Sequence, residues 1–300
     1  MKTVRYLPLL LCLSIGQALA DTPINLQHAA SPTAQISISN VSGEVRVTAW
    51  DRNQVQVTGR LGDGAKPLEI TGSDNDLSIK VESQGGGGWL NWGNNSHMGS
   101  SNLDIHVPTG ASLQIDVVSA PLSVDGTDGG KIKLNSISGR VRINAQTPSL
   151  EVESVSGGIA FAGHATRAAL QTVSGDILAP SLGNDVDLQT VSGRIQAGGG
   201  PWQRLKLSTV SGDVQLNGNI AAGGKLDIDS MSGDVQLQLP STLSSTIHAS
   251  SFSGDMRSDF GTPKESDNGP GSSLDAVAGN GNSKITIETF SGDLRIRKQD

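Results

Sequence analysis

The residue that follows each Ser-Gly pair is the first candidate for chemistry in this sequence. It is acidic or basic at Glu44, Arg140, Asp176, Arg194, Asp213, Asp234, Asp255 and Asp293. Calcium prefers carboxylate oxygens, so stacked Asp side chains would form a calcium ladder, with Asp213, Asp234 and Asp255 as neighbours and candidate metal ligands. The Asp-containing nonapeptide of calcium-binding β-rolls is absent, and the two arginines interrupt the column. The sequence therefore favours the alternative, a solvated position at a turn.

The other groups that commonly perform catalysis show no usable pattern. The five histidines, His28, His97, His106, His164 and His248, lack the spacing of metal ligands. The repeated serines are not framed by a Gly-x-Ser-x-Gly elbow or by a matched His and Asp. We therefore predict no catalytic residue and no cofactor.

Two tryptophans stand out in a polar loop at residues 84–101. Four glycines precede Trp89 and Trp92, and the segment has no hydrophobic period. Trp offers a large contact area with a polar handle, so Trp89 and Trp92 are candidate ligand contacts for a sugar ring or a partner protein. The alternative is that they cover an open end of the fold.

A repeated Ser-Gly motif organises the rest of the chain. The serines from Ser119 to Ser253 follow one another at steps of 19, 18, 18, 18, 19, 21 and 21 residues, and the last gap is 38 residues. A fixed period of this length indicates stacked structural repeats. The predicted turn residues of the array are Ser138, Gly139, Ser156, Gly157, Ser174, Gly175, Ser192, Gly193, Ser211, Gly212, Ser232, Gly233, Ser253, Gly254, Ser291 and Gly292.

Each repeat consists of two short strands joined by the Ser-Gly turn. Stacking would bury two aliphatic columns, one of Leu170, Leu188, Leu207 and Leu226, the other of Ile177, Ile195, Val214 and Val235. We also expect the apolar residue before each Ser-Gly pair, such as Val191, to lie in this thin core. Arg295, Arg297 and Lys298 close the last copy, where charge would protect an exposed edge strand.

These features predict an all-β fold, a β-solenoid with rungs of 18–21 residues. Eighteen residues per rung also fits a triangular left-handed coil, although the six-residue signature is lacking, and the handedness stays open. A sandwich of stacked β-hairpins is the competing architecture, but it does not require one turn sequence in every unit.

The first twenty residues have the pattern of an export signal. Lys2 and Arg5 precede an apolar run from Leu7 to Ile15, and Ala18-Leu19-Ala20 forms a small-x-small cleavage site. Lipidation at Cys12, the single cysteine, is the alternative, but Leu11 before it is too large. We expect an exported protein, periplasmic or at the cell surface, with no transmembrane segment in the mature chain.

The composition limits the range of partners. The formal charge is −7 with Lys2 and Arg5 included, which argues against nucleic acid. We expect a signal peptide at 1–20, an N-terminal β-strand segment at 21–110, and regular solenoid repeats at 111–300 with a polar insertion at 261–283.

The sequence also resembles a known family. The run from Val41 to Val57, the segment Leu103–Pro108 and the repeated Val-Ser-Gly-Asp are similar to the bacterial putative-adhesin family with β-strand repeats. The resemblance implies an exported repeat domain without catalytic residues.

The functional expectation is an exported, non-enzymatic binding or structural module at the cell envelope, similar to an adhesin. Its partner would be a surface glycan or an envelope protein, and the sequence does not determine its oligomeric state. Two alternatives stay open. One is a carbohydrate-active β-helix enzyme acting on an acidic polysaccharide, and the other is a periplasmic accessory protein of the envelope stress response.

Overall fold

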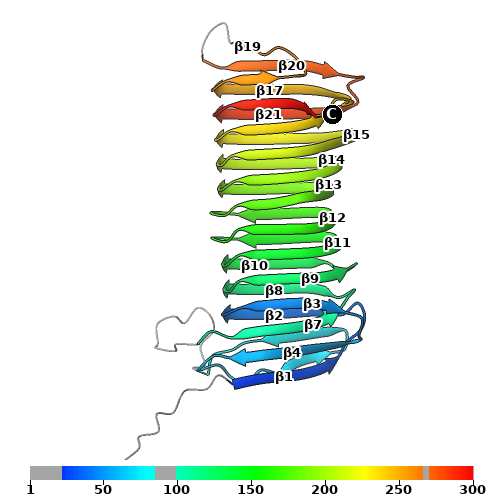
Figure 1. The fold of residues 1–300 in the computed structure, drawn as a ribbon, viewed down its shortest axis with the longest axis vertical. Helices are drawn as coiled ribbons and strands as arrows, with labels where there is room; N and C mark the ends of the chain where they lie inside the picture. Colours follow the sequence, from blue (N-terminus) through cyan, green and yellow to red (C-terminus); the bar gives the residue numbers. More distant parts are fainter. Residues whose placement is uncertain (1–21, 85–98, 266–269, 300) are drawn as a thin grey trace, which may run out of the picture.

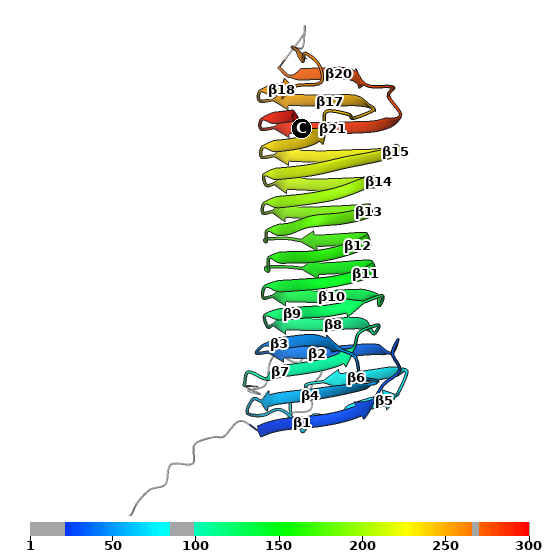
Figure 2. The ribbon, with the colours of Figure 1, turned by 45° about the vertical axis from the view of Figure 1, so that its right-hand side comes forward.

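The protein forms a long rod of stacked β-strands. The computed structural model describes residues 22–84, 99–265 and 270–299, and these contain 22 strands in one continuous hydrogen-bonded sheet. The strands lie one above another along the rod (Figure 1 and Figure 2). Within the described ranges, no helix is long and apolar enough to cross a membrane. The predicted all-β solenoid is confirmed.

The regular middle of the rod is built from strands that run parallel from rung to rung. Its strands are β8 (Ser112–Ser119), β9 (Leu122–Asp128), β10 (Ile132–Ser138), β11 (Val141–Ser154), β12 (Ile159–Thr172), β13 (Ile177–Ser192), β14 (Ile195–Ser211), β15 (Val214–Ser232) and β16 (Val235–Pro240). A long strand such as β13 begins after one Ser-Gly corner and ends at the next. Equivalent residues of successive rungs pair in parallel, as Leu170 does with Leu188, so the fold is not a stack of hairpins.

The chain does not add its rungs in sequence order at the N-terminal end. The strands there are β1 (Thr22–Ala29), β2 (Gln35–Ser42), β3 (Val45–Trp50), β4 (Gln54–Leu61), β5 (Ile70–Ser73), β6 (Asp76–Lys80) and β7 (Asn102–Pro108). The rung made by β2 and β3 lies between β6 and β7 on one side and β8 and β9 on the other. Antiparallel β4 and β1 then close this end of the rod.

The C-terminal end shows the same exchange of order. Its strands are β17 (Ser245–Ser253), β18 (Met256–Ser258), β19 (Lys264–Glu265), β20 (Ser272–Ala278), β21 (Ser283–Ser291) and β22 (Leu294–Gln299). The last rung in the sequence, β21 and β22, is inserted between β15–β16 and β17–β18. Strand β20 runs antiparallel to β17 and covers the stack (Figure 1). The prediction that charge protects an edge strand is therefore wrong for Arg295, because β22 pairs with both β16 and β18 at that residue. Arg297 and Lys298 pair in the ladder with β16 alone.

A single, mostly aliphatic core fills the rod, and its two largest fully buried side chains are Trp202 and Phe161. The two predicted columns, Leu170 to Leu226 and Ile177 to Val235, are buried to 1% exposure or less. Their alternation with outward polar residues is the period of two that a strand with one buried face requires. The core residues therefore fix which side chains of each rung face outward.

Candidate functional site

The apolar residue before each Ser-Gly pair lies on the surface of the rod, not in its core. Leu188 and Thr190 are buried, and the next residue, Val191, is 45% exposed. Since neighbouring residues of a strand point to opposite faces, Val191 points outward when Thr190 points inward. The prediction that Val191 belongs to the core is wrong for this reason.

Parallel pairing aligns these outward residues into one line, which we call the apolar row. In rung order the row contains Val41, Val118, Ile137, Val155, Val173, Val191, Val210, Met231, Phe290 and Phe252. All but Val118 are large apolar side chains with at least 41% of their surface exposed. Exposed apolar surfaces of this length are uncommon in monomeric proteins and are typical of interaction sites.

The apolar row forms one wall of a groove along the rod. The groove has a volume of about 1690 Å³ and follows the rungs from Val41 to Phe252 and Phe290. Between the apolar row and the other wall lies a line of small, buried residues such as Ser154, Thr172 and Thr190. Because these side chains are small and turned inward, the surface is hollowed between its two walls.

The second wall is polar, and we call it the polar rim. It lies two residues before the apolar row and contains Ser39, Asp116, Asn135, Glu153, Gln171, Gln189, Ser208, Asp229, Glu288 and Ser250. Four of these side chains are carboxylates and none is basic. The rim therefore gives the groove a negative edge beside its apolar wall.

A lysine already bound to a carboxylate stands at the N-terminal end of the groove. Lys80 Nζ lies 2.9 Å from Glu82 Oε1, and Lys66 Nζ lies 3.0 Å from Glu82 Oε2. Hydrogen bonds from Lys80 and Lys66 lower the pKa of Glu82 from 4.5 to about 2. Lys80 is the single basic side chain among the described residues of the groove, and this pairing offsets its charge.

The apolar row is widest at its C-terminal end. Met231, Phe290 and Phe252 follow one another on adjacent rungs, and each is at least half exposed. The two phenyl rings stack with centroids 4.8 Å apart and planes 6° from parallel. This end therefore offers a larger apolar contact than the valines of the middle rungs.

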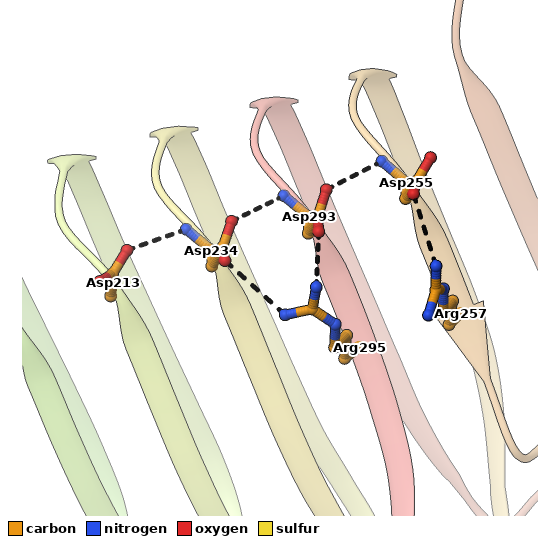
Figure 3. Close-up of polar contacts among 6 residues, drawn as sticks. All are labelled: Asp213, Asp234, Asp255, Arg257, Asp293 and Arg295. Atoms are coloured by element: carbon orange, nitrogen blue, oxygen red, sulfur yellow. Dashed lines mark hydrogen bonds and ion pairs between the residues drawn. The ribbon is translucent and has the colours of Figure 1, made fainter.

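The Asp column has a structural explanation (Figure 3). Asp213 Oδ1 accepts a hydrogen bond from the backbone N–H of Asp234 at 3.1 Å, and Asp234 Oδ1 accepts one from Asp293 at 3.0 Å. Asp293 Oδ1 in turn accepts one from the N–H of Asp255 at 3.2 Å. Each carboxylate thus satisfies a backbone donor of the next corner, which would otherwise lose a hydrogen bond.

The order of this column corrects one prediction. The order of the repeats in the sequence predicts Asp234 and Asp255 as neighbours, but Asp293 lies between them, because β21–β22 is inserted there. Arg295 Nη2 lies 2.6 Å from Asp293 Oδ2, and its Nη1 lies 3.7 Å from Asp234 Oδ2. The described residues contain no group of three or more His, Cys, Asp or Glu side chains placed to hold a metal ion.

The tryptophans and histidines singled out in the sequence do not form one site within the described part of the chain. Trp89, Trp92 and His97 lie outside the described residues. His248 Nδ1 lies 2.5 Å from Asp275 Oδ1 near the C-terminal cap. The ring of His106 lies near the other end, tilted by 33° against the ring of Trp50 with centroids 4.9 Å apart. The structure instead aligns the residues of the apolar row, whose hydrophobicity alone predicts a place in the core. The sequence does contain a pattern that predicts this outward position, since strict alternation counted from Leu188 places Val191 on the outer face.

Comparison with known proteins agrees with this architecture. A family model described as Toastrack DUF4097 matches residues 33–297. The chain belongs to this toastrack family. No curated protein matches it.

Two solved structures of bacterial proteins are similar to this chain. A "putative lipid binding protein" of Parabacteroides distasonis is 14% identical, with a TM-score of 0.53 over 92% of this chain and 96% of that chain. A "putative adhesin" of Bacteroides fragilis is 13% identical, with a TM-score of 0.46 over 92% of this chain and 98% of that chain. The first of these similarities supports the fold observed for this chain.

Proposed function

We propose that this toastrack protein is a non-catalytic binding rod of the cell envelope, which holds an elongated apolar ligand in its groove. The observation that carries the proposal is the apolar row, exposed on rung after rung along one side of the rod. Thr190 and Leu188 show that the inward positions already fill the core. The row is therefore free to contact something else.

The groove residues suit binding better than catalysis. Its ionisable side chains, within the described part of the chain, are Lys80 and the four carboxylates of the polar rim. It contains no His, Cys or Tyr there that could act near neutral pH as a base or a nucleophile. Its apolar wall instead offers repeated contacts of one kind, which is what an elongated ligand requires.

The place of action follows from the N-terminal sequence. Lys2, Arg5, the apolar run and the Ala18–Ala20 cleavage site support export to the envelope. We include the periplasm and the cell surface in the proposal. A rod that bears a binding groove along its length would act there as an adhesin-like or scaffolding module.

Binding of a neutral, environment-sensitive dye tests the groove. We expect Nile red fluorescence to rise on titration with purified protein, because the dye would leave water for the exposed apolar side chains of the apolar row. Substituting Val173, Val191 and Val210 together by Ser should weaken binding about tenfold, since three apolar contacts are lost. A thermal melt checks that the variant stays folded.

The matched control is Leu178→Ser. Leu178 is 48% exposed, close to the exposure of Val191, but it lies on another face of the rod and does not line the groove. This variant should bind the dye like the parent protein. Equal dye binding by the triple variant and the parent would contradict the proposed binding surface.

A further inference from the structure

The C-terminal third of the groove combines its largest apolar surface with its closest pair of carboxylates. Met231, Phe290 and Phe252 form the apolar wall there. Across the groove, Asp229 of β15 and Glu288 of β21 pair as neighbours in the parallel ladder. Two carboxylates on adjacent rungs lie about 5 Å apart along the rod, beside exposed phenyl rings.

These carboxylates are not neutralised by the protein itself. Within the described residues, no salt bridge involves Asp229 or Glu288. Arg295, the arginine nearest to Glu288 in the sequence, pairs instead with Asp293 and Asp234 at the Ser-Gly corner. The rim therefore keeps its negative charge available for a partner.

The charge of the rim limits what can cover the apolar row. A second copy that covers the apolar row with its own apolar row would bring one acidic rim against another, which costs energy at an interface. The opposite arrangement would place each acidic rim on an apolar row, where its carboxylates would lose water without gaining a charged partner. A fatty acid or an anionic phospholipid would place its charged group beside the same carboxylates. A partner with an apolar stripe flanked by Lys or Arg can pack its stripe on the apolar row and pair its cations with the carboxylates of the polar rim.

The spacing of the rungs indicates which form such a partner takes. Rungs repeat at about 4.8 Å and the turns of an α-helix at about 5.4 Å, so a helix lying along the groove drifts by about 0.6 Å per turn. Over about four turns, the total displacement between helix turns and rungs therefore stays within about half a rung spacing. That length presents one apolar side chain per turn to the row and several cations to the rim.

We propose that the groove wall of Met231, Phe290 and Phe252, with Asp229 and Glu288 opposite, binds a cationic amphipathic helix of a polypeptide partner. The proposal rests on the proposed function, since it names the ligand class of the same groove. The helix lies with its apolar stripe on the phenyl stack and its lysines or arginines on the rim. This is the helix-in-groove mode of peptide recognition, with charge added on one side.

Fluorescence anisotropy with designed peptides tests the inference. The probe is a labelled Leu/Lys amphipathic peptide of about 18 residues, long enough to form the helix. Its two controls are a Leu/Glu peptide of the same pattern and a Leu/Lys peptide with scrambled order. We expect the amphipathic Leu/Lys peptide alone to bind, and its affinity to fall as the salt rises from about 50 mM to about 500 mM.

Protein variants separate charge from apolar contact. Asp229→Asn with Glu288→Gln should weaken binding of the Leu/Lys peptide about tenfold, because both rim charges are lost. The control is Asp187→Asn with Asp227→Asn, which removes the same charge from the same outer face at two positions that do not line the groove. Asp187 Oδ1 accepts a hydrogen bond from Nε2 of the rim residue Gln189 at 3.0 Å, and the amide oxygen of an asparagine can accept the same bond. Phe290→Ser with Phe252→Ser should also lower the affinity for the Leu/Lys peptide, because the apolar wall of the groove is lost.

The outcomes distinguish this inference from the proposed function. The inference would be overturned if the Leu/Glu peptide or the scrambled peptide bound with the same affinity as the amphipathic Leu/Lys peptide. It would also be overturned if the rim variant and its control variant lost affinity for the Leu/Lys peptide equally. If the protein binds Nile red in the groove but not the Leu/Lys peptide, the inference fails and the proposed function stands. If neither binds, both fail.

Discussion

Replacing Leu188 by Asp is expected to unfold the protein, while the same substitution at Val191, three residues later, leaves it folded. Leu188 has no exposed surface, and a carboxylate there would be buried without a partner. The expected loss in the free energy of unfolding is about 5 kcal/mol or more. At Val191 the carboxylate would extend into water, and the loss should stay below about 1 kcal/mol.

Chemical denaturation of the two variants measures this difference directly. Both substitutions introduce the same side chain into the same strand, so each is the control of the other. A large loss in the free energy of unfolding for Val191→Asp would mean that the apolar row is part of the core. The groove would then have no exposed apolar wall. A small loss at Leu188 would contradict the placement of the inward column.

The second large effect is expected at the Ser-Gly corners. A Cβ added at Gly157 would lie 1.9 Å from the carbonyl oxygen of Gly139 in the adjacent rung. Backbone atoms cannot yield to such a contact unless two rungs separate, so Gly157→Ala should cost about 3 kcal/mol. The reason is close packing of backbones, because Gly157 does not have a positive φ.

The adjacent glycine is a matched control for this substitution. A Cβ at Gly158 would lie 3.5 Å from the nearest atom, the carbonyl oxygen of Asp176, which is an ordinary contact, and Gly158 has no positive φ. Gly158→Ala should therefore be neutral or slightly stabilising, since alanine restricts the unfolded chain. Similar thermal midpoints for the two variants would show that the corners are not packed as tightly as described.

The repeat made most of the fold predictable from the sequence. A period of 18–21 residues with one turn motif specifies parallel stacking, and alternation specifies the buried columns from Leu170 to Leu226. The order of the rungs at the two ends was not predictable in this way. Strands β2–β3 and β21–β22 fit between rungs that are distant in sequence, and every copy of the motif offers similar edges for pairing.

The binding site was harder to predict, because hydrophobicity alone does not distinguish a core residue from a contact residue. Val191 is as apolar as the residues of the core, and its neighbour Thr190 is polar but buried. Strict alternation counted from Leu188 gives the correct orientation, but the turn at Ser192 makes the end of the strand ambiguous. The groove also depends on the sum of many rungs, and no single repeat contains it.

The central claim is that the apolar row contacts a ligand in the envelope, and site-specific photo-crosslinking in intact cells tests it most directly. A photoreactive amino acid is placed at Val191 in the full chain, and at Leu178 as the control position of similar exposure. The account predicts a defined crosslinked adduct from position 191 and none from position 178. Adducts of equal yield from both positions, or none from position 191, would contradict it.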